Sequence, residues 1–320
     1  MKKVRVLHHD NCFDGVASAA VFSRFYERCV DSNVSFEYEG VAHNAGQYFQ
    51  EETFSGDENV IVDFKYSSSD RLTWWFDHHE SAFLSPEDET HFRQDESGRK
   101  FHDPDYLSCT KYIAHISQSV FGYPMEDLEE LIHWADIIDG AKFRDAQMAV
   151  ELKEPALQLM QVMEGVRSRE LIRRIITDLG TRSLAEVAAE PEVRRTFEAF
   201  YRSHLETIEI LRKSMTCIDR VVEFDVSAYD FEGYNKFIPY YVYPESVYNV
   251  GVSLGPARAK VSVGTNPWTD HENRHNLAKL CERYGGGGHS VVAAISFRPD
   301  ALEDARHAAR AIAEILRREP

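Results

Sequence analysis

The sequence predicts an α/β protein with two domains, a parallel-sheet domain first and a smaller α/β domain last, joined by a helical connector. The chain has 320 residues, of which 43% are apolar, and this is enough for two domains that each have a hydrophobic core. Strand-like runs return from Arg220, before a closing helical pattern at Leu302–Arg318. In the first part, helical stretches alternate with short apolar runs, as a parallel sheet requires; the runs are Val4–Leu7, Phe36–Val41, Val60–Phe64 and Leu72–Phe76.

The expected boundaries are residues 1–145, 146–219 and 220–320. The connector is predicted from helical patterns at Glu170–Leu179 and Ser183–Thr216. The polar stretch Ser81–Asp105 is interpreted as a long surface loop that acts as a lid. A helix is expected to begin at Ser108 as its N-cap, and reception of a phosphate by its first amides is the less favoured alternative.

Charge and composition narrow the class of partner. The formal charge is −17, from 53 acidic and 36 basic residues, whereas proteins that track long nucleic acids normally carry a basic face. We therefore expect short substrates and no long nucleic acid. No apolar run approaches the roughly 20 residues of a membrane span, and no secretory signal is seen. Five scattered cysteines indicate a reducing compartment, so a cytoplasmic location is predicted.

Acidic and imidazole side chains follow several predicted elements. Asp77-His78-His79 closes one apolar run, and Asp63 closes another. Further clusters are His8 to Asp14, before a helix, and Asp136 to Asp139, at a helix end. Ligands of open α/β sheets lie at the carboxyl ends of the strands, so these side chains are expected to converge on one site.

Mixed carboxylate and imidazole ligands suit Mn²⁺, with Mg²⁺ possible, and the chain lacks the cysteine pairs of zinc sites. Two such ions about 3.5–4 Å apart would clamp a phosphoryl group and activate a water for in-line attack. The sequence therefore predicts a metal centre for phosphoryl chemistry.

Spacing alone does not decide two of the expected metal ligands. His8 and His9 face opposite sides of a strand, so one of them points at the site, and spacing favours His8. A shift of the turn would instead bring in His9 or Asp10. Asp136 and Asp139 share one helix face; Asp136 is preferred, with Asp139 as a supporting or helix-end residue.

The glycine run Gly285–Gly288 is the second unusual feature. Four glycines lose much conformational entropy on folding, but they allow close backbone approach and their amides can line an anion. A flexible linker is the alternative, which a helix-like flank before the run and a strand-like flank after it oppose. His289 follows directly and can donate a hydrogen bond to a phosphate oxygen.

These motifs carry a family resemblance. The pattern His8-x-x-x-Cys12-x-Asp14-Gly15, Val62-Asp63, Asp77-His78-His79 and Ala135-Asp136 resembles, in order and spacing, the four motifs of the DHH phosphoesterase superfamily. The segment Arg283 to Ala294 resembles the GGGGH branch of the DHH-associated substrate-binding domain. The resemblance spans nearly the whole chain.

The resemblance implies roles for individual residues. His78 would face the substrate phosphate or a metal, His79 would support the site, and Asp63 and Asp77 would share two ions. Related domains often carry an arginine near the position of Gly264, which contacts the terminal phosphate of the substrate. This chain has no arginine there, so Arg258, Lys260 or Arg283 is expected to make that contact. The implied metal ligands are His8, Asp14, Asp63, Asp77 and Asp136; the implied catalytic residues are Asp77, His78 and His79; the implied substrate-binding residues are Gly286, Gly287, Gly288, His289, Arg258 and Arg283.

Cys12 departs from the family pattern, which has aspartate there. Its thiolate would be a softer metal ligand, and a neutral buried thiol is the equal alternative. The expected number of ions is therefore one or two.

The resulting expectation is a metal-dependent phosphoesterase, exonuclease-like, that hydrolyses short oligonucleotides, dinucleotides or small nucleotide phosphates in a cleft between its domains. The alternatives are an exopolyphosphatase-like hydrolase and a nucleotide-binding sensor with little catalysis. A pyrophosphatase of this superfamily is disfavoured, because the basic sequence signature in the second domain of those enzymes is not found in this chain. The resemblance also implies a homodimer.

Overall fold

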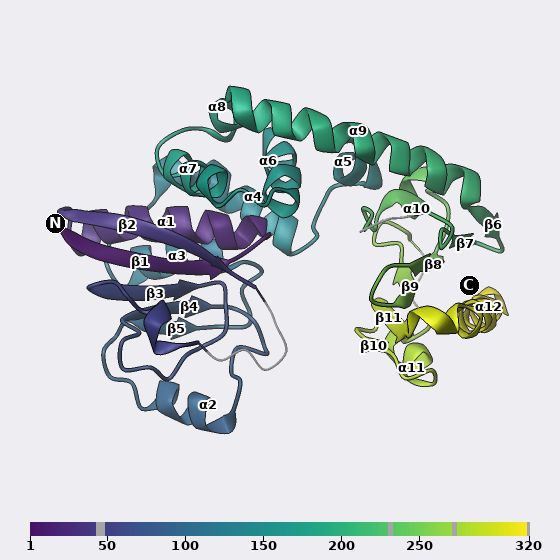
Figure 1. Cartoon of the computed structure of the whole chain (residues 1–320), viewed down its shortest axis with the longest axis horizontal. Coiled ribbons are helices and arrows are strands. Elements are labelled where there is room, and N and C mark those ends of the chain that lie inside the picture. The colour runs from purple at the N-terminus through teal and green to yellow at the C-terminus, as the bar shows by residue number, and fades with distance from the viewer. Residues whose placement is uncertain (43–48, 230–232, 271–273, 319–320) are drawn as a thin grey trace. The chain divides into compact units, whose positions relative to one another are not determined.

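The computed structural model describes residues 1–42, 49–229, 233–270 and 274–318, and the chain divides into two units (Figure 1). Unit 1 is Met1–Phe143 with Leu152–Phe200, and unit 2 is Arg144–Glu151 with Tyr201–Pro320. The helices of the expected connector, residues 146–219, are thus divided between the two units.

Unit 1 is built on sheet A, which has five strands in the order β2-β1-β3-β4-β5, all parallel. The strands are β1 Lys2–His9, β2 Val34–Val41, β3 Glu58–Val62, β4 Trp74–Asp77 and β5 Lys100–His102. The predicted α/β class and parallel sheet are confirmed.

Helices cover both faces of sheet A, since side chains alternate along each strand. On one face, Phe22 of α1 (Phe13–Cys29) contacts the rings of Trp74 and Phe76. On the other, Trp75 contacts Phe92 of α2 (Pro86–Arg93). An apolar core on each face holds the strand ends in a fixed arrangement.

The interpretation of Ser81–Asp105 as a lid loop is wrong, because this stretch contains α2 and the edge strand β5. Ser85 caps α2 by accepting a hydrogen bond from Asp88 N at 3.2 Å, and Pro86 lies in its first turn. The three residues of β5 are too few for a clear period, and their strand conformation comes from pairing with β4.

The other helices of unit 1 begin at recognisable caps. Ser108 caps α3 by accepting a hydrogen bond from Lys111 N at 3.2 Å, as predicted. The helical pattern at Ser183–Thr216 forms two helices, because Pro191 has no amide hydrogen and begins a new one. The helices are α3 Cys109–Ser119, α4 Glu129–Asp139, α6 Pro155–Gly165, α7 Arg169–Leu179, α8 Leu184–Ala188 and α9 Pro191–Ser214, which continues into unit 2.

Unit 2 is built on sheet B, with six strands in the order β10-β11-β9-β8-β7-β6. Only the β7–β8 pair is parallel. One face packs against α12, where Val250, Val261 and Ile295 share a core with Ile312 and Leu316. The elements are β6 Thr216–Ile218, β7 Val221–Asp225, β8 Tyr248–Leu254, β9 Ala259–Thr265, β10 Gly287–Gly288 and β11 Val292–Phe297, with helices α5 Ala146–Glu151, α10 Ile238–Val242, α11 Leu277–Glu282 and α12 Leu302–Arg318.

The aromatic segment Phe237–Tyr243 contains the short helix α10, not the expected strand. Phe237 and Tyr240 are buried, and the Asn249 amide donates a hydrogen bond to the Tyr240 hydroxyl. These two rings are therefore buried inside unit 2 and are not exposed for stacking on a base. Among the described residues, no helix is both long and apolar enough to cross a membrane.

Lys100 is predicted to stabilise unit 1 through a buried ion pair. Its side chain is 7% exposed and its Nζ lies 2.9 Å from Asp95 Oδ2 and 3.2 Å from the Tyr66 hydroxyl. Replacing Lys100 by Met leaves the Asp95 carboxylate unpaired, and the free energy of unfolding in urea should fall by about 3 kcal/mol. Arg93→Met, in the exposed pair with Glu89, should cost less than about 0.5 kcal/mol. Equal losses in the two variants would contradict this role.

Candidate metal centre

Three neighbouring strands of sheet A end at one edge, where the polar side chains gather. His9 is the last residue of β1, Asp63 follows β3, and Asp77 is the last residue of β4. The strand order places β3 between β1 and β4. The convergence expected at the carboxyl ends of parallel strands is therefore present.

Gly15 lets the start of α1 approach this edge. A Cβ atom at this position would lie 2.3 Å from the carbonyl oxygen of His9 and 2.8 Å from its Cβ. Any larger residue would push α1 away from β1, so Gly15 keeps Cys12 and Asp14 beside His9.

Seven residues form three groups, and within each group the nitrogen, oxygen or sulfur atoms all lie within 4.8 Å of one another. Asp63 belongs to the first two groups and His78 to the last two, so the groups are joined in one cluster. The groups are His9, Cys12 and Asp63; Asp63, His78 and His79; and Asp14, His78 and Asp139.

His78 is oriented by a backbone carbonyl. Its Nδ1 lies 3.0 Å from the Tyr106 carbonyl oxygen and donates a proton to it, which leaves Nε2 for the site. Nε2 lies 3.4 Å from Asp63 Oδ1, 3.4 Å from Asp139 Oδ2 and 3.7 Å from Asp14 Oδ2. One imidazole nitrogen thus faces three carboxylates.

Asp14 is fixed by the N-terminus of α3. Its Oδ2 accepts a hydrogen bond from Cys109 N at 2.7 Å, and its Oδ1 accepts one from Thr110 N at 3.0 Å. These amides are the ones considered for a substrate phosphate. That alternative is wrong, because a protein carboxylate already binds them.

Asp77 holds His79 in place. Its Oδ1 accepts hydrogen bonds from His78 N at 2.9 Å and from His79 Nδ1 at 2.7 Å. His102, on β5, contacts the His79 carbonyl oxygen through its Nε2 at 2.9 Å. The remaining His79 nitrogen, Nε2, is the one left for a substrate, and the side chain is 37% exposed.

The charges of the cluster shift several pKa values. Burial would raise the pKa of Asp63, but the imidazoles of His78 and His9 hold it at about 2. Burial would lower the pKa of His78, yet the carboxylates of Asp63 and Asp14 raise it to about 10. Burial and the charge of Asp63 raise the pKa of Asp139 to about 6. Crowded carboxylates of this kind favour a bound cation.

Three buried atoms in or beside the cluster support a cation. Asp63 Oδ1, Asp77 Oδ2 and His78 Nε2 have no hydrogen-bond partner among the described residues. Buried polar atoms without partners are rare in folded proteins, and a metal ion satisfies carboxylate and imidazole groups together. Asp63 also has a positive φ of 56°, a conformation uncommon outside glycine and often found at functional sites. The donor set therefore fits a divalent ion.

The structure places His9, not His8, in the cluster. His9 Nδ1 lies 3.3 Å from Asp63 Oδ2, while His8 Nδ1 contacts the His9 carbonyl oxygen at 3.0 Å. His8 is 1% exposed, and burial lowers the pKa of its imidazole. Alternation along the strand lets one of the two histidines face the cluster, and in the structure that histidine is His9, the last residue of β1, whose side chain lies on the side of Asp63.

Asp139 replaces Asp136 in the same way. Asp136 Oδ2 forms an ion pair with Lys111 Nζ at 2.7 Å, and its Oδ1 accepts a hydrogen bond from Ser108 at 3.3 Å. It therefore ties α4 to the start of α3. Asp139, at the last turn of α4, lies 3.4 Å from His78, so the structure brings Asp139 and not Asp136 into the cluster.

Cys12 belongs to one of the three groups of possible metal ligands, whereas Asp77 belongs to none. The Cys12 sulfur lies in the group with His9 and Asp63, and burial raises the pKa of its thiol well above the usual value. Asp77 appears in none of the three groups, although its Oδ2 has no hydrogen-bond partner. Asp63 is thus the carboxylate that joins two groups in the structure.

The glycine run is ordered backbone, so the linker alternative is wrong. Gly287 and Gly288 form β10 and pair with Ala294 and Ala293 of β11. A Cβ atom on Gly286 would lie 2.4 Å from the Ala294 carbonyl oxygen, and Gly288 has a φ of 145°. Both positions thus require glycine. Gly287 meets no atom within 4 Å, so its backbone is accessible, and His289 is exposed.

The expected arginines lie apart from one another. Arg283 ends α11 just before the glycine run and is exposed. Arg258 lies before β9 and its Nη1 donates to the Ser296 hydroxyl at 3.1 Å. At Gly264 a Cβ atom would lie 2.8 Å from the Asn249 amide and the Tyr240 hydroxyl, which explains why no arginine fits there.

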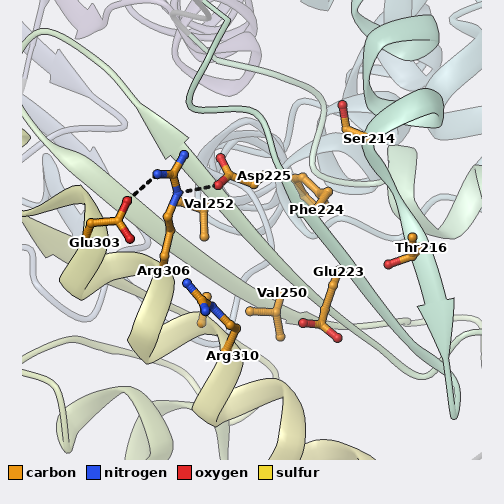
Figure 2. Close-up of a pocket in the computed structure, with 11 residues that line it drawn as sticks. Ser214, Thr216, Glu223, Phe224, Asp225, Val250, Val252, Glu303, Arg306 and Arg310 are labelled. Atoms are coloured by element: carbon orange, nitrogen blue, oxygen red, sulfur yellow. Dashed lines mark hydrogen bonds and ion pairs between the residues drawn. The ribbon is translucent and has the colours of Figure 1, made fainter.

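Unit 2 also has a hollow of about 480 Å³ between α12 and strands β6 to β8 (Figure 2). Figure 2 shows Arg306 between Asp225 and Glu303. Its Nε lies 2.7 Å from Asp225, its Nη1 lies 2.5 Å from Glu303, and its Nη2 donates to Ser227 at 2.9 Å. The contacts with Asp225 and Ser227 join α12 to the end of β7, and the contact with Glu303 lies within α12.

Comparisons with known proteins support the fold. No protein-family model matches the chain, and no curated protein matches it. The structure of the pGpG-specific phosphodiesterase PggH from Vibrio cholerae is similar, with a TM-score of 0.72 and 18% identity over 98% of this chain and 99% of that chain. The structure of a DHH-domain member of the s1p family of ribosomal proteins is also similar. Its TM-score is 0.57 and its sequence identity is 14%, over 97% of this chain and 86% of that chain. The chain therefore has the two-domain fold of DHH-domain proteins, as the motif resemblance implied.

Neutralising each of the two α4 carboxylates should separate their roles. We predict that Asp139→Asn weakens Mn²⁺ binding, measured by calorimetry, by at least about tenfold, because the negative charge of a carboxylate facing His78 is lost. Asp136→Asn is the matched control and should change the affinity by less than about twofold. The reverse ranking would return the ligand role to Asp136.

The Arg306 contact should make unit 2 sensitive to acid. Burial would raise the pKa of Asp225, but hydrogen bonds from Ser227 and Arg306 lower it overall. A carboxyl with a depressed pKa in the folded state stabilises above its unfolded pKa, near 4, and this is lost as the pH falls through the folded value. In a double-mutant cycle of Asp225→Asn and Arg306→Met, we expect a coupling below about 1 kcal/mol at pH 7 that disappears towards pH 3. A coupling independent of pH would contradict the ion pair.

Proposed function

We propose that unit 1 carries a metal-dependent phosphoesterase centre that hydrolyses phosphate esters of short nucleotides. The observation that carries the proposal is the joined cluster around Asp63 and His78, with its buried atoms that have no hydrogen-bond partner. A divalent ion bound there would polarise a phosphoryl oxygen and lower the pKa of a bound water. Clusters of this composition at a strand edge suit phosphoryl transfer, where charge neutralisation is the main contribution.

Each residue of the cluster has a distinct part in this proposal. His9, Cys12, Asp14, Asp63, His78 and Asp139 would hold the ion or ions. Asp77 keeps Nδ1 of His79 engaged, so Nε2 of His79 is the atom that would exchange a proton with the substrate. The amides of α3 keep the Asp14 carboxylate turned towards His78. Mn²⁺ is the proposed ion, because it accepts imidazole and thiolate more readily than Mg²⁺ does.

The proposed substrate class is a short oligonucleotide or dinucleotide. The net charge of −17 disfavours long polyanions. PggH, the protein of similar fold, is named for pGpG, and a phosphorylated dinucleotide is our first candidate for this chain. Binding of the substrate by Gly286, Gly287, Gly288 and His289, a cytoplasmic location and a homodimer remain predictions.

The test is a substrate panel with Mn²⁺ at neutral pH. The panel contains a 5′-phosphorylated dinucleotide, a short RNA, adenosine 3′,5′-bisphosphate, polyphosphate and the nitrophenyl ester of thymidine monophosphate. We expect hydrolysis of the dinucleotide, reduced more than about a hundredfold in Asp63→Asn and in His78→Ala, beyond the loss typical of residues that only orient ligands. Asp136→Asn is the control and should retain most of the activity.

Two outcomes would redirect the proposal. Cleavage of polyphosphate alone would show an exopolyphosphatase-like enzyme. Tight nucleotide binding without hydrolysis under any divalent ion would favour a sensor, and Cys12 would then be the first residue to replace by Asp.

A further inference from the structure

His79 lies outside the strands of sheet A, in the turn that follows β4. Its carbonyl oxygen closes this turn by accepting a hydrogen bond from Ala82 N at 3.2 Å. The same oxygen accepts a second bond, at 2.9 Å, from Nε2 of His102, the last residue of β5. A carbonyl oxygen can only accept, so Nε2 of His102 carries the proton. One imidazole therefore ties the turn to the edge strand of the sheet.

The His102 ring is held in its plane by aromatic side chains. It stacks on the indole of Trp75, with ring centroids 5.6 Å apart and an angle of 17° between the planes. The ring of Phe83 lies across it, at 5.4 Å and 72°. Trp75 is fully buried and lies on β4, the strand that ends at Asp77. A His102 ring tilted out of this plane would lose the stacking, which stabilises aromatic pairs beyond the area that they bury.

The strand β5 does not need the His102 side chain for its own pairing. Main-chain pairing already joins β5 to β4, and in this register His102 lies opposite Asp77. Asp103 N also donates to the Asp77 carbonyl oxygen, at 3.3 Å. The bond from Nε2 is thus an addition to a strand that is held without it, and it acts on the His79 turn.

The His79 imidazole is placed mainly by hydrogen bonds. Its side chain is 37% exposed, so packing alone does not fix it. Asp77 Oδ1 accepts from Nδ1 at 2.7 Å, which holds the ring, and His102 holds the main chain that carries the ring. A reacting group that is displaced by about 1 Å can lose about a hundredfold in rate.

We propose that His102 is a positioning residue for His79. Through the His79 carbonyl it keeps the main chain of the turn in place, while Asp77 holds the ring, so that Nε2 of His79 stays directed towards the substrate. His102 belongs to none of the groups of possible metal ligands, and the carbonyl already occupies its donor. The catalytic part of this proposal rests on the proposed function, whereas the ordering of the turn does not.

Two substitutions separate the donor of His102 from its ring. His102→Phe keeps an aromatic ring on Trp75 and removes the donor. His102→Gln removes the ring and places an amide N–H close to the position of Nε2. His91→Phe is the matched control, because His91 contacts the Tyr66 hydroxyl at 2.8 Å beside the same apolar core. Among the described residues, His91 has no hydrogen bond to the His79 turn.

The first measurement is hydrogen exchange, followed by mass spectrometry, in the full chain without metal. We expect the amides of residues 79–82 to exchange at least about threefold faster in His102→Phe, because the turn loses a hydrogen bond and opens more often. His102→Gln should return them to within about twofold of the unaltered chain, and the amides of β1 should exchange alike in every variant. Equal exchange of the turn in His102→Phe and in the unaltered chain would overturn the proposal.

The second measurement is steady-state hydrolysis of the 5′-phosphorylated dinucleotide with Mn²⁺. We expect kcat to fall about tenfold in His102→Phe, because the placement of His79 changes, while KM and the calorimetric Mn²⁺ affinity stay within about twofold. His102→Gln should recover most of the loss, and His91→Phe should keep kcat even if its unfolding temperature falls as far.

The outcomes separate a positioning role from a structural one. An equal loss of kcat in His91→Phe and His102→Phe would show that His102 only stabilises the fold, and would overturn the proposal. An unaltered chain that hydrolyses nothing would count against the proposed function, and the exchange measurement would still decide whether His102 holds the turn.

Discussion

The centre of unit 1 depends on the bond between the Asp14 carboxylate and the first amides of α3. The carboxylate is 1% exposed, and both oxygens accept hydrogen bonds, at 2.7 and 3.0 Å. A buried carboxylate is costly unless its oxygens are satisfied, and a helix N-terminus supplies amides with a partial positive charge. This one contact joins α1 to α3 and turns Asp14 towards His78. The rest of the cluster is arranged around that pair.

Backbone groups orient much of the cluster. The Tyr106 carbonyl fixes the His78 ring, and backbone amides fix Asp14. Such contacts leave no side-chain signal in the sequence, so Tyr106 could not be identified beforehand. His102 was also missed, because the short strand that carries it was interpreted as a loop. Orientation by backbone is robust, since substitution of the orienting residue need not remove the contact.

Charged side chains are arranged differently in the two units. In unit 1, carboxylates and imidazoles crowd together, and their pKa values shift in opposite directions, as Asp63 and His78 show. In unit 2, the Arg306 guanidinium lies between the carboxylates of Asp225 and Glu303. Among the described residues, neither Arg258 nor Lys260, on the opposite face of sheet B, takes part in an ion pair, and Arg258 donates to the Ser296 hydroxyl.

The sequence by itself determined the fold class, the parallel sheet, the cap at Ser108 and the strand ends at which the site forms. Apolar runs, caps and turn residues are local signals, and each acts within a few residues. It also reduced the first expected ligand to His8, His9 or Asp10 and the last to Asp136 or Asp139. Only the tertiary structure chose His9 and Asp139. Alternation and helical spacing fix which residues share a side, but the packing of neighbouring elements decides which side meets Asp63 and His78.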